Sequence, residues 1–236
     1  MDGVVLMGTI NFDLYPEIRD AGSLSSAMAE AADKAGLDLP GVRSQSEVGP
    51  GVISTAQVDS SRGKVLVWLD ESTRTFFVGI QEGRFVWAEG ATDDLAALVA
   101  ASVAWRDGMF VGEFANNFPF MTLTRLAKAR EMGDPVPAQW DWLLNSETFE
   151  EERPLVEAAC TEYRLRQLFP NLSHGTLRLS TNLGVQGSRE IHIKPMDGGR
   201  YRVEDTSVSG SPYDTGSLME AVVTAAGFLD RCPDSE

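Results

Sequence analysis

The sequence predicts an α+β fold of two modules, each a helix, an antiparallel meander and a second helix. In both halves, short β-branched and aromatic runs joined by turns precede an Ala-rich amphipathic segment, over residues 52–105 and 176–229. Such runs are typical of antiparallel strands. We therefore expect an N-terminal module over residues 1–107, a helical connector packed between the modules over 108–148, and a C-terminal module over 149–236, with internal duplication as a hypothesis.

The first module is predicted from a change in hydrophobic period. Residues 23–35 carry apolar side chains at helical spacing, with Ser23 as the N-cap and Gly36 as the left-handed residue that ends the helix. The period then shortens to that of strands, which we expect at residues 52–58, 64–69, 75–80 and 84–88. Asp93 or Thr92 is expected to cap the next helix.

The second module repeats this order. A helix is expected over 151–168, with Pro154 tolerated in its first turn, and the last helix is expected over 216–231. Between them the sequence predicts strands at 176–180, 190–194 and 200–204, with a glycine turn at 197–199.

The connector over 108–148 is too apolar to be a flexible linker. We expect a helix over 123–131, after which Pro135 and Pro137 break the chain before residues 140–144. Residues two positions apart on a helix differ by about 200° around its axis, so Trp140 and Trp142 face different ways. One is expected in the core, and the other against a second element or a binding partner.

The chain is strongly acidic. It has 20 Lys and Arg against 35 Asp and Glu, a formal net charge of −15. That charge repels phosphate backbones, so nucleic acid and anionic membranes are not expected as partners. Two interpretations remain open, a solvated surface that keeps the protein in solution and a surface that attracts a basic protein or peptide.

Other composition signals favour a cytoplasmic protein without cofactors. Cys160 and Cys232 are the two cysteines, too few and too distant for a disulfide framework or a zinc site. The first residues do not resemble a signal peptide, and no run of apolar residues is long enough to span a membrane. The two histidines and two cysteines show no metal-ligand spacing, and no glycine-rich phosphate loop occurs, so no metal or cofactor is expected.

The chain has two histidines, the residue type that most often serves as a general base or metal ligand. His192 alternates with isoleucines on an expected strand and therefore shares a solvent face with Glu190 and Lys194. His174 precedes a strand in a Ser-His-Gly segment, where sites are often built, and either a catalytic role beside Ser173 or Cys160 or a structural role in the turn is possible.

Arg164, Arg166 and Arg178 form the remaining candidate site. Guanidinium groups bind planar carboxylates and phosphates in a bidentate manner, so the three could clamp an anion. In so acidic a chain, internal salt bridges are the competing interpretation. Together with His174, Trp140 and Trp142, these arginines are the binding candidates that the sequence offers.

Several segments of the chain resemble a known family. They lie between Tyr15 and Asp230 and comprise residues 15–17, 23–28, 129–133, 140–144, 165–177 and 199–203, the longest reading Leu-Arg-Gln-Leu-Phe-Pro-Asn-Leu-Ser-His-Gly-Thr-Leu. The chain resembles an actinobacterial family of unknown function whose members are often labelled natural-product biosynthesis proteins. This resemblance implies no catalytic residue.

Three functions are compatible with these observations. The first is a non-enzymatic accessory protein that binds a protein or peptide on an open sheet face, on a sheet edge or between the modules. The second is a biosynthetic enzyme with a site near His174, Arg166 and Arg178. The third is an immunity or antitoxin-like protein.

Overall fold

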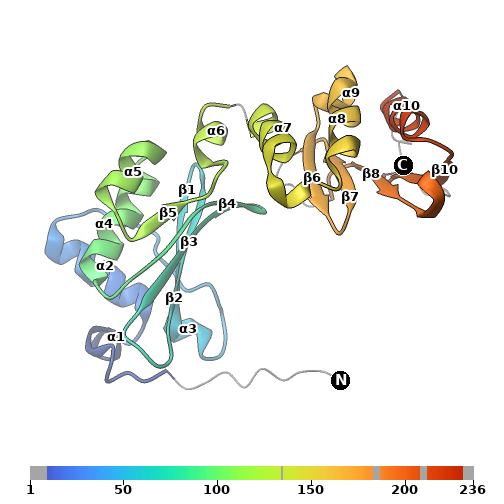
Figure 1. The fold of residues 1–236 in the computed structure, drawn as a ribbon. Helices are drawn as coiled ribbons and strands as arrows, with labels where there is room; N and C mark the ends of the chain where they lie inside the picture. Colours follow the sequence, from blue (N-terminus) through green and yellow to red (C-terminus); the bar gives the residue numbers. More distant parts are fainter. Residues whose placement is uncertain (1–9, 134, 183–186, 208–211, 231–236) are drawn as a thin grey trace. The chain divides into compact units, whose positions relative to one another are not determined.

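A computed structural model of the chain describes residues 10–133, 135–182, 187–207 and 212–230 (Figure 1). It confirms the α+β fold, with helices and two antiparallel five-stranded sheets. The chain divides into two compact units between Lys128 and Ala129. Each unit is described by itself.

Unit 1 contains helices whose ends follow from local sequence. The expected helix over 23–35 is α2, which Ser23 caps by accepting a hydrogen bond from the Ser26 amide and which Gly36 ends at φ 67°. The cap of α4 was predicted one or two residues early, because Asp94 rather than Asp93 or Thr92 accepts from the first free amides. The helices are α1 Pro16–Ala21, α2 Leu24–Ala35, α3 Gly51–Ser54, α4 Leu95–Arg106, α5 Val111–Asn117 and, across the division, α6 Ala127–Glu131.

Sheet A of unit 1 is a meander with one added edge strand. Its order follows the chain and comprises β1 Thr55–Ser60, β2 Gly63–Leu69, β3 Phe76–Glu82, β4 Phe85–Thr92 and β5 Met121–Leu123. The strand expected from residue 52 begins three residues later, since the chain after Pro50 turns through the short helix α3. The predicted helix over 123–131 is reduced to α6, because residues 121–123 pair with β4.

The core of unit 1 lies on one side of sheet A. Figure 1 shows α2 and α4 on the same side of the sheet, and both pack on β1. Val67 of β2 and Val78 of β3 are almost completely buried on this side, as are Met28 of α2 and Leu98 of α4. An aromatic series, in which each ring contacts the next, continues this core into the expected connector through Phe85, Trp87, Trp105, Phe114, Phe118 and Phe120.

The first helices of unit 2 differ from the prediction in where they begin and end. Pro135 and Pro137 start α7 rather than break the chain, because a first-turn proline lacks only an amide that has no partner in the helix. The single helix expected over 151–168 is two, because Glu162 is extended (ψ 113°) and caps the second. The helices are α7 Pro135–Asn145, α8 Arg153–Thr161, α9 Tyr163–Arg166 and α10 Leu218–Phe228, with 3-10 turns at Glu147–Phe149 and Asp197–Gly199.

Sheet B of unit 2 is a second antiparallel meander. Its strands pair in chain order and comprise β6 Phe169–Ser173, β7 Thr176–Ser180, β8 Glu190–Pro195, β9 Tyr201–Asp205 and β10 Tyr213–Thr215. The three central strands were predicted, and the two edge strands were not. The inner residues of the sheet form one core with α7, α8, α9 and α10, centred on Leu177, Ile193, Leu155 and Val222.

The expected connector over 108–148 contributes to both units. Its strand β5 completes sheet A, while Trp140 and Leu143 of α7 are buried in the core of unit 2. Both units follow the predicted order of helix, antiparallel meander and helix. Internal duplication stays a hypothesis, because a common order of elements is compatible with independent origins.

Candidate functional site

His174 lies in a tight turn. It forms the two-residue connection of β6 to β7 with Gly175, and both residues have positive φ, 50° and 71°. Such turns require two left-handed residues, a conformation that histidine adopts more readily than most side chains. Its exposed ring has Nδ1 3.1 Å from Oγ of Ser173. The turn geometry accounts for this segment.

The three candidate arginines are on two elements and are not joined by a described contact. Arg164 of α9 forms ion pairs with Glu162 at 3.2 Å and Asp230 at 2.8 Å. Arg166 and Arg178 are exposed and, within the described ranges, form no ion pair. Internal salt bridging therefore accounts for one of the three.

Trp140 and Trp142 have the different surroundings that their spacing predicts. Trp140 is 2% exposed and donates its indole N–H toward the carbonyls of Arg166 and Leu168, at 3.0 and 3.1 Å. Trp142 is half-buried, and its ring packs edge-on against Phe149. Both side chains thus have structural contacts within unit 2.

Cys160 and His192 complete the set of reactive side chains. Burial raises the pKa of the Cys160 thiol, an effect that the charge of Arg166 opposes in part, so the reactive thiolate is disfavoured. His192 lies on the predicted outer face of β8, where its Nε2 is 2.8 Å from Glu190. Cys232 lies outside the described residues.

The outer face of sheet B is polar. Cross-strand register places Asn171, Arg178, His192 and Glu204 in one row across β6, β7, β8 and β9. Charged and amide groups of this kind are well solvated at a sheet surface. This side of unit 2 therefore needs no covering element.

The outer face of sheet A has a different character. Trp68 of β2 is 40% exposed and stacks on Phe77 of β3, with ring centroids 5.8 Å apart and planes at 23°. Trp68 pairs with Phe77, and Phe77 pairs with Ala91, so these three residues lie on the same side of the sheet. Leu66 is two residues before Trp68 on β2 and Glu89 is two residues before Ala91 on β4, so both lie on that side as well. We call Leu66, Trp68, Phe77, Glu89 and Ala91 the Trp68 face. It is the candidate binding site of unit 1.

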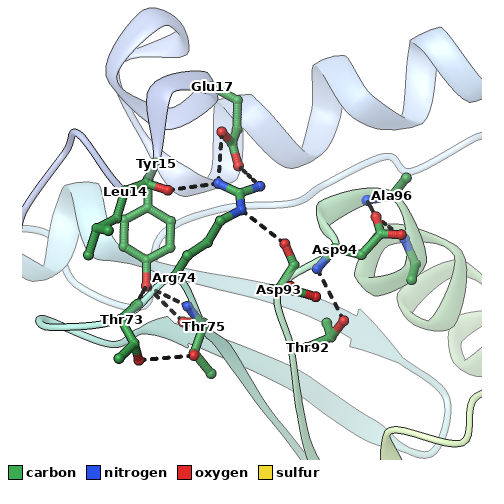
Figure 2. A network of polar contacts seen from close by, with 11 residues as sticks. Leu14, Tyr15, Glu17, Thr73, Arg74, Thr75, Thr92, Asp93, Asp94 and Ala96 are labelled. Atoms are coloured by element: carbon green, nitrogen blue, oxygen red, sulfur yellow. Dashed lines mark hydrogen bonds and ion pairs between the residues drawn. The ribbon is translucent and has the colours of Figure 1, made fainter.

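A polar network holds the loop over residues 70–75, which connects β2 to β3 (Figure 2). Tyr15, which is 0% exposed, accepts a hydrogen bond from the Thr75 amide at 2.9 Å, and its hydroxyl lies within 2.9 Å of the carbonyls of Asp70, Thr73 and Thr75. Arg74 forms an ion pair with Glu17 at 2.7 Å and donates to the carbonyl of Leu14. Residues 70–75 are thereby fixed to the start of α1.

The carboxylate of Asp70 stabilises the same loop from within. It accepts from the amides and hydroxyls of Ser72 and Thr73, and these hydrogen bonds lower its pKa to about 2. Burial is the largest effect on Tyr15 and raises the pKa of its phenol. At neutral pH the network therefore contains a neutral phenol and an ionised carboxylate.

Sequence reasoning overlooked Trp68, although a signal was present. In the run over 64–69, alternation places Val65, Val67 and Leu69 on one face, and thus Leu66 and Trp68 on the other. A half-exposed strand normally has polar residues on its solvent face. Two apolar residues at solvent positions, one of them tryptophan, could have identified this surface.

Metal-ligand clusters and membrane-spanning helices are both absent from the described residues. Across the described ranges, no group of three or more His, Cys, Asp or Glu side chains is arranged to hold a metal ion. None of the helices in those ranges is long and apolar enough to cross a membrane.

The comparisons with known proteins match one region of the chain. Residues 134–232 match the model of a family of unknown function (DUF6193), and these residues fall within unit 2. No curated protein and no solved structure matches the chain. The expected resemblance to a family of unknown function is confirmed for this region, and unit 1 lies outside the match.

Proposed function

We propose that the protein is a non-enzymatic accessory protein that binds an extended segment of a partner protein on the Trp68 face. The observation that carries this proposal is the exposure of Trp68, because Trp87 and Trp105 of the same unit are only 3% and 0% exposed. Tryptophan is enriched among residues that dominate binding energy at interfaces. Apolar patches on an open surface commonly mark interaction sites.

The face of sheet A is better suited to binding than its β1 edge. Arg43 already pairs with Gln57 of β1 through two backbone hydrogen bonds, which occupies part of this edge. On the face, by contrast, Trp68 is exposed, its stacking partner Phe77 is half-buried, and both rest on strands whose connecting loop is held by the Tyr15 network. A preformed face reduces the ordering cost of binding.

Charge indicates the class of partner. The chain carries a formal charge of −15, which attracts basic segments and speeds their encounter with the surface. The biosynthetic setting of the proposed function rests on the resemblance of the sequence to proteins with that label. The competing hypothesis of an enzyme at His174, Arg166 and Arg178 has less support, since no described contact joins these side chains.

Selection from a random peptide library displayed on phage tests the proposal. The wild-type chain serves as bait, with a Trp68→Thr variant as the matched control, because threonine preserves β-propensity while it removes the ring. Circular dichroism and unfolding curves establish that the variant is folded. We expect peptides that are enriched on wild type and lost on Trp68→Thr, whereas equal enrichment on both baits would refute the proposal.

A further inference from the structure

We infer that the Trp68 face contains a subsite for one cationic side chain of the partner segment, an arginine or lysine, held between the Trp68 ring and the Glu89 carboxylate. The inference rests on the proposed function and specifies its chemistry. Three features carry it, namely the position of the Trp68 ring, the unpaired carboxylate of Glu89, and the distance between Glu89 and Lys64.

The Trp68 ring reaches across to the neighbouring strand. Gly79 of β3 is buried although it has no side chain. A Cβ atom placed on Gly79 would be 3.5 and 3.6 Å from Cζ3 and Cη2 of Trp68, which is van der Waals contact. The end of the indole therefore covers Gly79, and Phe77 supports the ring by stacking at its side.

Glu89 lies in register with the residue that the end of this ring covers. Glu89 of β4 is directly opposite Gly79 in the antiparallel register, and opposed residues have Cα atoms about 5 Å apart. Glu89 is exposed, and among the described residues its carboxylate makes no hydrogen bond or ion pair. Three other carboxylates of unit 1 already have partners, since Glu17 pairs with Arg74, Asp59 with Arg43, and Asp70 caps its own loop.

Lys64, a cation on the outer side of β2, is too distant to neutralise Glu89. Lys64 is exposed on β2, two strands away from β4, and it is displaced from Glu89 by one row of side chains along the strands. Standard sheet spacings then give about 12 Å between the Cα atoms of Lys64 and Glu89. That separation exceeds the Debye length of about 8 Å at physiological ionic strength. Lys64 instead pairs in register with Asp59, whose pKa is lowered by Arg43, by Gln57 and in part by Lys64.

These features match the requirements of a guanidinium group. A cation within about 6 Å of an indole face is attracted by the ring, and a planar guanidinium can stack on it while it donates to a carboxylate. Gly79 places no side chain of its own between the ring and Glu89, and Nε2 of Gln81, 3.7 Å from a Cβ atom placed on Gly79, borders the same position. Arginine, which combines both contacts, is expected to bind more tightly than lysine.

A double-substitution cycle tests the subsite directly. The probe is a synthetic copy of the most enriched library peptide, made with arginine and with citrulline, its neutral isostere, at each basic position in turn. Affinities are measured by isothermal titration for wild type, Glu89→Gln and Glu113→Gln. Glu113 is an exposed residue of α5 and provides the matched loss of one negative charge.

We expect one citrulline position to weaken binding to wild type and Glu113→Gln about fivefold to tenfold. The same change should have less than a twofold effect on Glu89→Gln. Enriched peptides without arginine or lysine, or a citrulline effect that persists in Glu89→Gln, would overturn the subsite and leave the proposed function intact. Enrichment that does not depend on Trp68 would overturn both.

Discussion

The hydroxyl of Tyr15 provides a quantitative test of how the Trp68 face is held. Replacing Tyr15 with phenylalanine keeps the buried ring and its edge-on contact with Phe76 at 5.5 Å. It removes the acceptor of the Thr75 amide and the donor to the carbonyls of the 70–75 loop. A buried N–H group without a partner costs about 1–3 kcal/mol, so we expect a loss of about 2 kcal/mol in the free energy of unfolding of unit 1.

For a unit of this size, that loss corresponds to a decrease of roughly 8 °C in Tm. The assay is equilibrium urea unfolding followed by circular dichroism, with amide hydrogen exchange at Thr75 as a local measurement. Tyr163→Phe is the matched control, since Tyr163 is 74% exposed and its change is expected to stay within about 0.5 kcal/mol. If Tyr15→Phe matched this control, the hydroxyl would not be what holds the loop.

Two further predictions concern charged groups, in addition to those tested above. Asp205 is 7% exposed and pairs with Arg189 at 2.6 Å; burial alone would raise its pKa, but this ion pair and hydrogen bonds from Ser207 lower it overall. Asp205→Asn is therefore expected to destabilise unit 2 by about 3 kcal/mol in urea, and a neutral result would contradict the structural role of the pair. Asp70 has a folded pKa of about 2, below its ordinary 3.8, so its stabilising effect is complete above pH 4 and is lost as pH falls toward 2. In unfolding curves measured over a series of pH values, Asp70→Asn should reduce the decrease in the stability of unit 1 between pH 4 and pH 2. An unchanged decrease would refute the stabilising role of Asp70.

Local sequence patterns predicted the centres of both sheets well. The alternation in residues 64–69 and 190–194 places one apolar face on each core, and β2 and β8 are observed there. The helix over 23–35 was equally clear, because a serine cap and a left-handed glycine marked both ends. In these segments the local pattern and the tertiary packing favour the same structure.

The short edge strands β5 and β10 could not be predicted in this way. β5 and β10 have three residues each, and their pairing with β4 and β9 depends on contacts with distant segments. The helix break at Glu162 was also hidden, since the apolar spacing continues through it. Long-range pairing of this kind has no periodic signal in a short window.

The candidate site was predicted only in part, because sequence reasoning favoured residues with recognisable chemistry. His174 and Trp140 stood out by type, and both have structural roles in a turn and a core. Trp68 and Glu89 are ordinary strand residues in the sequence. Their relation depends on the register of β2, β3 and β4, which places the Trp68 ring over Gly79 beside Glu89.

The most direct test of the account is a map of where a selected peptide binds. Backbone amide and indole resonances are assigned by NMR, and the peptide most enriched on wild type is titrated into the labelled chain. We expect the largest shifts on the Trp68 indole and on the amides of Phe77 and Glu89. Shifts concentrated instead around His174 and Arg178 of unit 2 would contradict it.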